Sequence, residues 1–193
     1  MKKTILTAVC GALLFSSCAH EFNQVYKSPD NSYKYEYAKE SFALGKYQRA
    51  ITLLTDLINI QKGTNKAEES LYMLGMAQYL SKDYESASET FKKYTKSYPR
   101  GIYAEQAFYY VGQSLYMSTP EPRLDQTPTI AAIAAFQDYL DLYPNASLKG
   151  VAQQRLFENC SQPSSTTILA PISATAPMAA ATTRLASSPP RMR

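Results

Sequence analysis

The sequence predicts an all-α protein, a solenoid of helix-turn-helix hairpins followed by a disordered C-terminal tail. Apolar residues recur at helical spacing in short segments. The segments come in pairs joined by short turns, and matching positions return after 37 residues. After residue 158 the composition changes abruptly, because aromatic and acidic residues no longer occur.

The clearest hairpin is expected between residues 68 and 101. Helices are expected at residues 69–80 and 84–97, where apolar residues return every three or four positions. Residues 81–83 separate the two helices, and Pro99 follows the second, where proline cannot continue a helix. The stretch therefore predicts a helix, a turn and a second helix.

Five residues are expected to pack this hairpin together: Leu71, Leu74, Gly75, Ala87 and Phe91. Gly75 and Ala87 are small enough for the two helices to approach closely. The order of a large residue, Leu and Gly, then Ala, Phe and Pro, resembles one tetratricopeptide repeat. The resemblance implies a stack of such hairpins, because one hairpin alone cannot bury its own apolar face.

The same frame recurs on both sides of this hairpin. Ala38 and Ala50 repeat the 12-residue spacing of Gly75 and Ala87. Downstream, Gly112 is followed by its partner Ala132 only after 20 residues, so the third repeat carries an insertion of 8 residues. Prolines predict that this insertion, within Ser118–Pro128, is a loop: Pro120, Pro122 and Pro128. The repeats are expected at about 32–64, 68–101 and 105–146, with a partial fourth at 147–158.

Six aromatic residues share one face of the predicted first helices. They form two sets seven residues apart, which is two helical turns: Tyr35, Tyr72 and Tyr109, and Phe42, Tyr79 and Tyr116. In the tetratricopeptide family this face lines the concave surface. Either these side chains pack between adjacent first helices, or they form an aromatic groove that holds an extended or helical peptide.

The first 17 residues are expected to be a signal peptide. Two lysines precede an apolar run of 11 residues from Ile5 to Phe15, which is too short to span a bilayer. Ser16 and Ser17 then precede Cys18, which resembles a lipoprotein box with cleavage between Ser17 and Cys18 and acylation of the cysteine. The alternative is ordinary cleavage that leaves a free thiol. Acyl chains would tether the protein to a membrane.

The mature chain offers few groups for catalysis or metal binding. Residues 18–31 are expected to be a tether, with a helix cap near Asp30. Removal of Cys10 and lipidation of Cys18 would leave Cys160 as the one free cysteine, and His20 is the only histidine. No phosphate-binding loop or nucleophile motif occurs, so neither an enzyme nor a cofactor is expected. From Cys18 to Glu158 there are 15 basic and 16 acidic residues, which gives no reason to expect nucleic-acid binding.

The last segment, residues 159–193, cannot bury enough apolar surface to fold. It is either a disordered extension or a product of translation out of frame. With suitable synonymous codons, the same shift of reading frame, applied from Ser165 and from Ala186, gives amino-acid sequences that are typical of helices and partly aromatic. The chain would then be a truncated form that lacks its C-terminal repeats.

The order of these features resembles the BamD family, the ComL-like outer-membrane lipoproteins. The features are the signal, the cysteine, the tether, and repeats that end in Tyr98-Pro99 and Tyr143-Pro144. The resemblance covers residues 18 to about 157. It implies a non-enzymatic subunit of the β-barrel assembly machinery, lipid-anchored in the outer membrane and facing the periplasm. Its implied partners are other assembly subunits and unfolded outer membrane proteins.

Another periplasmic repeat lipoprotein is the competing interpretation. It would act in envelope maintenance, or in glycan capture with the aromatic residues as sugar-stacking platforms.

Overall fold

The computed structural model describes residues 21–61, 64–119 and 126–160, and all regular structure in these ranges is helical. Three hairpins follow one another in chain order: α2 (Asn31–Ala43) with α3 (Tyr47–Ile60), α4 (Asn65–Leu80) with α5 (Tyr84–Ser97), and α6 (Ala104–Met117) with α7 (Thr127–Leu142). Helix α8 (Lys149–Cys160) follows the third hairpin. The predicted all-α stack of hairpins is confirmed.

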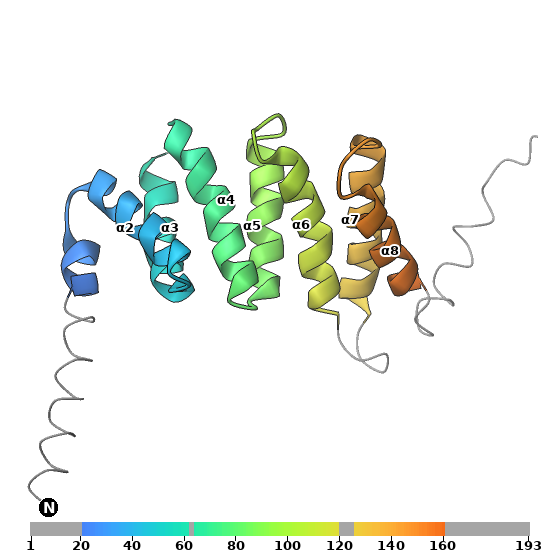
Figure 1. Cartoon of the computed structure of the whole chain (residues 1–193), viewed down its shortest axis with the longest axis horizontal. Helices are drawn as coiled ribbons and strands as arrows, with labels where there is room; N and C mark the ends of the chain where they lie inside the picture. The colour runs from blue at the N-terminus through green and yellow to red at the C-terminus, as the bar shows by residue number, and fades with distance from the viewer. Residues whose placement is uncertain (1–20, 62–63, 120–125, 161–193) are drawn as a thin grey trace, which may run out of the picture.

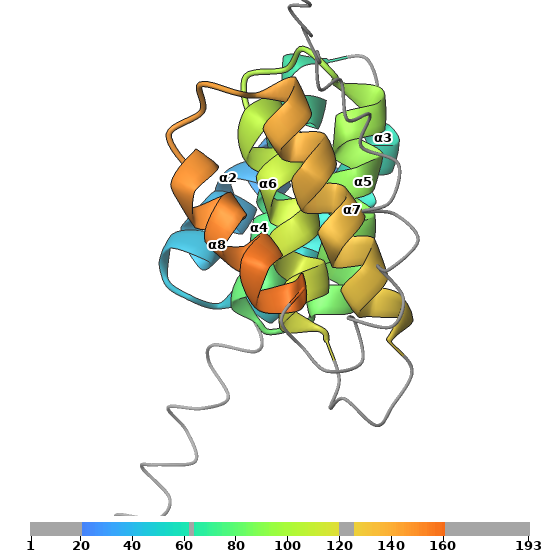
Figure 2. The same ribbon diagram turned by 90° about the vertical axis from the view of Figure 1, so that its right-hand side faces the viewer.

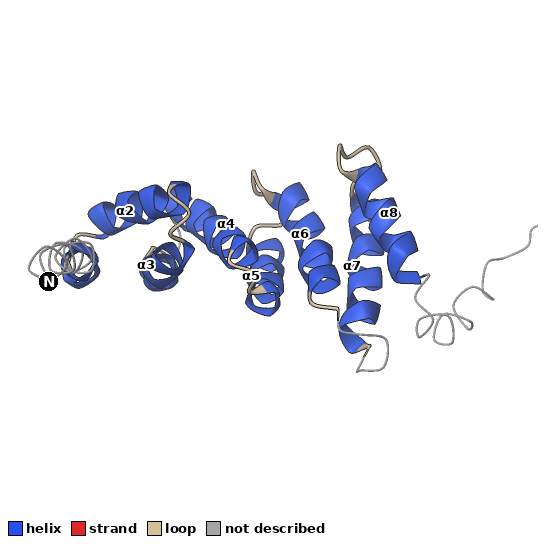
Figure 3. Ribbon diagram, turned by 60° about the horizontal axis from the view of Figure 1, so that its bottom comes forward, coloured by secondary structure: helices blue, strands red, loops and turns tan. Residues whose placement is uncertain are grey.

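The helices form two rows. Figure 3 shows α2, α4 and α6 along one side and α3, α5 and α7 along the other, and Figure 1 shows the hairpins succeeding one another from one end to the other. We call these sides the first-helix face and the second-helix face. In Figure 2, which looks onto the C-terminal end, α7 and α8 lie nearest to the viewer.

The core lies where each first helix packs on the second helices before and after it. The predicted packing residues are buried there: Ala38, Ala50, Leu54, Leu71, Leu74, Ala87, Phe91, Ala132 and Phe136. Each of the three hairpins contributes to one large cluster of buried residues, and a second, smaller cluster lies between α6, α7 and α8. Burial of this apolar surface supplies the main stabilising free energy.

The turns of the first two hairpins have the same geometry. Gly45 (φ +72°) and Lys82 (φ +66°), 37 residues apart, both adopt the left-handed conformation. The following amides close the same six-residue turn, from Lys46 N to Ser41 O (2.8 Å) and from Asp83 N to Gln78 O (2.9 Å). This arrangement is a helix-terminating Schellman motif. The shared frame therefore extends from the core into the turns.

Helix boundaries differ from the prediction in two places. Helix α4 begins at Asn65 rather than Glu69, so four further residues before the apolar face are helical. Pro128 lies in the first turn of α7 instead of the inserted loop. Proline is tolerated there because the first backbone N–H groups of a helix have no intrahelical partner.

The expected tether is also partly folded. Residues 21–27 are helical, and Val25 is fully buried. The ring of Phe22 lies 6.4 Å from that of Tyr37, and the guanidinium of Arg49 lies 5.6 Å from the Phe22 ring. The segment thus covers the open end of the first hairpin. Asp30 caps α2 as predicted, since its carboxylate accepts hydrogen bonds from Ser32 N (2.8 Å) and Tyr33 N (3.2 Å).

Candidate peptide-binding surface

The six predicted groove residues lie on α2, α4 and α6, but they differ in exposure. Tyr35 and Tyr109 are buried, whereas Phe42, Tyr72, Tyr79 and Tyr116 are half-buried. The signal peptide, with its expected cleavage site at Ser17 and lipidation site at Cys18, and the tail from residue 161 lie outside the described residues.

The two buried tyrosines pack between helices. Tyr109 lies 6.0 Å from Phe136 and 5.7 Å from Tyr139 between ring centres, and its hydroxyl donates to Gln113 Oε1 (3.2 Å). Burial raises the pKa of the Tyr109 hydroxyl. Two lysine ammonium groups lie over the ring of Tyr35, that of Lys39 at 5.3 Å and that of Lys66 at 5.1 Å from the ring centre. Tyr35 thus lies beside the adjacent first helix α4, whereas Tyr109 packs against the second helix α7.

Tyr79 and Tyr116 also contact neighbouring helices. The Tyr79 ring lies 5.5 Å from Tyr84 and 5.2 Å from Tyr110, in edge-to-face geometry with both. Tyr116 donates to Glu158 Oε2 (2.9 Å), and the Arg155 guanidinium lies 4.9 Å from its ring. Tyr116 thereby connects α6 to α8.

Tyr72, on α4, contacts three other aromatic rings. Its ring stacks on Tyr103 with the centres 4.4 Å apart and the planes 8° from parallel. Phe91 and Tyr94 each lie 6.0 Å away. The Tyr72 hydroxyl donates to Gln106 Oε1 at 2.6 Å, so α4 is bonded directly to α6. These contacts hold the Tyr72 ring against Tyr103 and connect α4 to α6.

Two depressions on the first-helix face share Tyr72. The first, of about 180 Å³, lies between α2 and α4, and it is lined by Phe42, Glu69, Tyr72, Met73, Met76 and Tyr103. The second, of about 450 Å³, is lined by Tyr72, Ile102, Glu105, Gln106, Tyr110, Ser147 and Leu148. The first is mainly apolar, with one carboxylate at its edge, whereas the second has more polar groups. Together they form a surface that suits successive side chains of a bound segment.

Lys39 and Glu69 cross from α2 to α4 at the edge of the first depression. The Lys39 ammonium lies 3.2 Å from Glu69 Oε1, and both side chains are partly exposed. Such an exposed ion pair contributes little stability. It leaves a charge of each sign available to a bound chain.

Several residues of this surface were not predicted from the sequence. Met73 and Met76 line the first depression, and flexible methionine side chains adapt to varied apolar ligands. Tyr103 is the residue before α6 and does not belong to either repeating aromatic set. The adjacency of Met73 to Tyr72 and its distance of one helical turn from Met76 are signals that could have found the methionines.

A loop between the second and third hairpins is held by the carboxylate of Glu68. Glu68 Oε1 accepts hydrogen bonds from the Tyr94 hydroxyl (2.5 Å) and from Ile102 N (2.7 Å). The Tyr94 oxygen in turn accepts a hydrogen bond from Tyr103 N (3.1 Å). The loop thus holds Tyr103 against Tyr72 and presents Ile102, which is 87% exposed, beside the second depression.

Gly101 permits this contact. A side chain at position 101 would meet the Glu68 carboxylate and the Tyr94 hydroxyl. In the third repeat, Ala146 occupies the position of Gly101, and Tyr139 occupies the position of Tyr94. The Tyr139 hydroxyl is buried and has no hydrogen-bond partner among the described residues. Burial, with Glu105 nearby, raises the pKa of Tyr139 to about 12. The loop contact is thus specific to the second repeat.

Over the described ranges, none of the helices combines the length and the apolar character needed to span a bilayer. Within the same ranges, no group of three or more His, Cys, Asp or Glu residues is arranged to hold a metal ion.

The architecture defines a helical-repeat protein with an adaptable surface on its first-helix face. Residues 27–159 match the family described as YfiO, outer membrane lipoprotein, and the chain belongs to this family. The chain is also similar to the outer membrane protein assembly factor BamD of Caulobacter vibrioides, with 23% identity over 143 residues. This similarity covers 72% of the chain and 47% of that protein, so the chain spans about half the length of the curated relative it matches.

Proposed function

We propose that this protein acts in outer membrane protein assembly as a lipid-anchored, non-enzymatic binding subunit. The main support for this proposal is membership of the outer membrane lipoprotein family. The name of the Caulobacter relative indicates outer membrane protein assembly as the process. Cys18 would hold the anchor, and the repeats would face the periplasm. Other subunits of the β-barrel assembly machinery would be its stable partners.

The proposed ligand is an unfolded segment of an outer membrane protein, bound on the first-helix face. The adjoining depressions around Tyr72 support this ligand because one is apolar and the other is more polar. Strands of membrane barrels alternate between apolar and polar side chains. An extended segment that crossed Tyr72 could therefore place unlike side chains in the two depressions.

Glycan capture has less support. Sugar-stacking sites need an open aromatic ring face, whereas the Tyr72 ring is stacked on Tyr103 and Tyr109 is buried. Envelope maintenance by the same binding surface remains the second candidate, because it would use the same repeats with other ligands.

Binding of an unfolded barrel protein tests this proposal. Met73→Glu would place a carboxylate in the apolar depression, and we expect affinity for a fluorescently labelled, urea-diluted barrel protein to fall about tenfold or more. Met73→Gln, which keeps the length without the charge, should give a smaller loss. Gln48→Glu is the matched control, because it adds the same charge at an exposed site on α3. Equal affinities for Met73→Glu and Gln48→Glu would contradict the proposal.

A further inference from the structure

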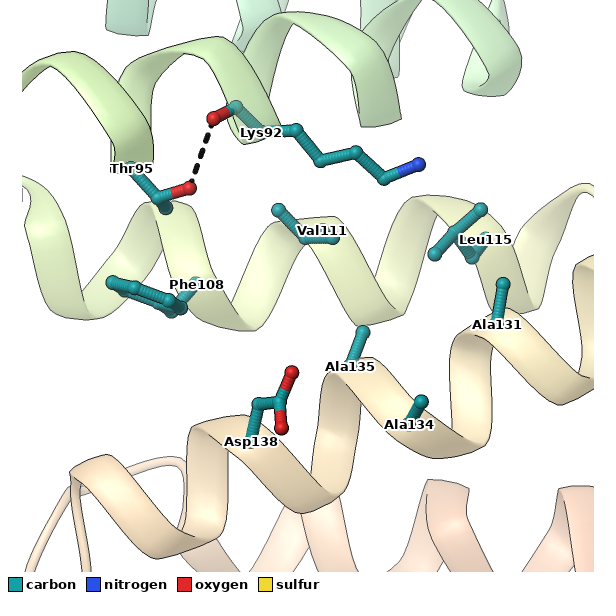
Figure 4. A pocket seen from close by; sticks show the side chains of 9 residues that line it. All are labelled: Lys92, Thr95, Phe108, Val111, Leu115, Ala131, Ala134, Ala135 and Asp138. Atoms are coloured by element: carbon teal, nitrogen blue, oxygen red, sulfur yellow. Dashed lines mark hydrogen bonds between the residues drawn. The ribbon is translucent and has the colours of Figure 1, made fainter.

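The second-helix face carries an apolar groove in the third repeat. Helix α6 lies between α5 and α7 in Figure 4 and forms the floor of this groove with Phe108, Val111 and Leu115. The groove has a volume of about 310 Å³. Its walls are Lys92 and Thr95 on α5, and Ala131, Ala134, Ala135 and Asp138 on α7. It is distinct from the depressions around Tyr72, because all of its wall residues belong to second helices.

The groove is specific to the third repeat. When Ala132 is aligned with Ala87, the α7 wall residues Ala131, Ala134, Ala135 and Asp138 correspond to Ser86, Glu89, Thr90 and Lys93 of α5. On the floor, Leu115 corresponds to Gln78, whose side chain accepts a hydrogen bond from Thr90 (2.6 Å). The second repeat therefore has polar residues along this wall and at one floor position, whereas the floor positions of Phe108 and Val111 are the apolar Leu71 and Leu74. Ordinary packing of the repeat does not require this difference.

The charges at the two walls have opposite signs. Lys92 lies on the α5 wall and Asp138 on the α7 wall, and both are exposed (Figure 4). Lys92 forms an ion pair with Glu89 within α5 at 2.8 Å. Such an exposed ion pair contributes little to stability. Among the described residues, Asp138 takes part in none of the ion pairs. A ligand with a basic residue on the α7 side and an acidic residue on the α5 side would complement both walls.

The shape of the groove suits a helical ligand. Phe108, Val111 and Leu115 are spaced by three and four residues, so the floor extends about 10 Å, or two helical turns. These spacings of three and four residues match the spacing of the anchor side chains on a bound helix. A helix satisfies its own backbone and presents anchors at positions i, i+3 or i+4, and i+7. Small side chains on the α7 wall allow it to approach closely.

We propose that this groove is a docking site for an amphipathic α-helix of a partner protein, oriented with its basic flank toward Asp138 and its acidic flank toward Lys92. The protein would then bind two kinds of ligand on opposite faces. This proposal does not depend on the proposed function, since the groove and the Tyr72 surface share no residue.

A synthetic helix tests the orientation and the chemistry together. The probe is a stapled helical peptide with leucine at i, i+3 and i+7, arginine on one flank and glutamate on the other. A matched peptide has the arginine and glutamate exchanged. Each is titrated into the isotopically labelled full-length protein, and amide chemical shifts are recorded. We expect the shifts to centre on Ala131, Ala134 and Ala135, and exchange of the flanks to weaken binding about tenfold.

Two variants take their residues from the second repeat. Ala134→Glu, at an exposed position, should abolish binding of the first peptide without loss of helical circular dichroism. Asp138→Lys should weaken the first peptide and strengthen the exchanged one. The proposal is overturned if these amides do not respond at millimolar peptide, if both peptides bind equally, or if sedimentation shows a dimer that Ala134→Glu converts to a monomer.

Discussion

The ring of Phe91 lies against Gly75, so closely that a Cβ at Gly75 would be 2.8 Å from the ring. The third repeat reproduces this contact between Phe136 and Gly112, also at 2.8 Å. In the first repeat, Ala38 and Leu54 occupy the two positions, and both are fully buried. A larger residue on the first helix is thus matched by a smaller one on the second.

This relationship predicts a rescue between repeats. Gly75→Ala alone should destabilise the protein by about 1–2 kcal/mol, because overpacking against Phe91 outweighs the better helix propensity of alanine. Adding Phe91→Leu, which recreates the pair of the first repeat, should recover part of the loss. Gly150→Ala is the control, since a Cβ at position 150 meets nothing within 4 Å. Urea unfolding is measured for the wild type, Gly75→Ala, Phe91→Leu, the double variant and Gly150→Ala, and strictly additive effects of Gly75→Ala and Phe91→Leu would contradict the size matching.

The equivalent turns give a second prediction. Lys82 holds a left-handed conformation that Gly45 adopts without steric cost, so Lys82→Gly should raise the free energy of unfolding by up to about 1 kcal/mol. Gly45→Ala should lower it by a similar amount. Thermal melts followed by circular dichroism measure both changes. If Lys82→Gly did not raise the free energy of unfolding, the left-handed conformation of Lys82 would not be strained.

The Glu68 carboxylate gives a third prediction. Glu68→Ala leaves the Tyr94 hydroxyl and Ile102 N–H without their acceptor, and we expect a loss of about 1–3 kcal/mol. Glu68→Gln keeps an acceptor oxygen and should lose less. Hydrogen exchange at Ile102 and Tyr103 should rise in Glu68→Ala while exchange in α2 stays unchanged. Uniformly faster exchange throughout the chain would instead indicate global destabilisation.

The buried tyrosines predict a loss of stability in alkali. Burial raises the pKa of Tyr35, Tyr72, Tyr94 and Tyr109 above the ordinary value, and that of Tyr139 to about 12. A folded-state pKa above the unfolded one leaves stability intact below about pH 10 and reduces it as pH rises through the folded values. Melting temperature should therefore hold up to about pH 10 and then fall steeply. The phenolate absorbance of these buried tyrosines should increase together with unfolding, and their ionisation well before unfolding would contradict this account.

The anchor gives a fifth prediction. Cys18→Ala should abolish acylation and move the protein from the detergent-rich to the aqueous phase in a phase-separation assay. The control is Cys160→Ala, which should leave partitioning unchanged. Retention of Cys18→Ala in the detergent-rich phase would mean that another feature holds the protein to the membrane.

The repeat frame could be predicted from the sequence because it rests on local spacing. Gly75 and Ala87 lie on consecutive helices of one hairpin, so their separation alone indicates a close contact. Pro128 was misplaced because proline occurs both in loops and in the first turn of helices. The burial of Val25 could not be predicted, since it depends on how residues 21–27 meet the first hairpin.

The binding surface was less predictable than the fold. Equivalent positions such as Tyr35 and Tyr72 repeat in sequence but differ in exposure, because each neighbouring hairpin supplies different contacts. Tyr103 joins the surface only through its stacking on Tyr72 and the Glu68 hydrogen bonds. These contacts link residues about 30 positions apart, and periodicity within one helix does not report them.

Site-specific photocrosslinking tests the central claim most directly. In one variant a photoreactive amino acid replaces Met76, which lies in the depression beside Tyr72. In the other it replaces Gln48, which is exposed on α3. Each variant of the whole chain is incubated with an unfolded outer membrane barrel protein and irradiated. We expect crosslinks from position 76 to the unfolded barrel protein, none to the same protein once folded, and few from position 48. Equal crosslinking from both positions, or none from position 76, would contradict binding at the first-helix face.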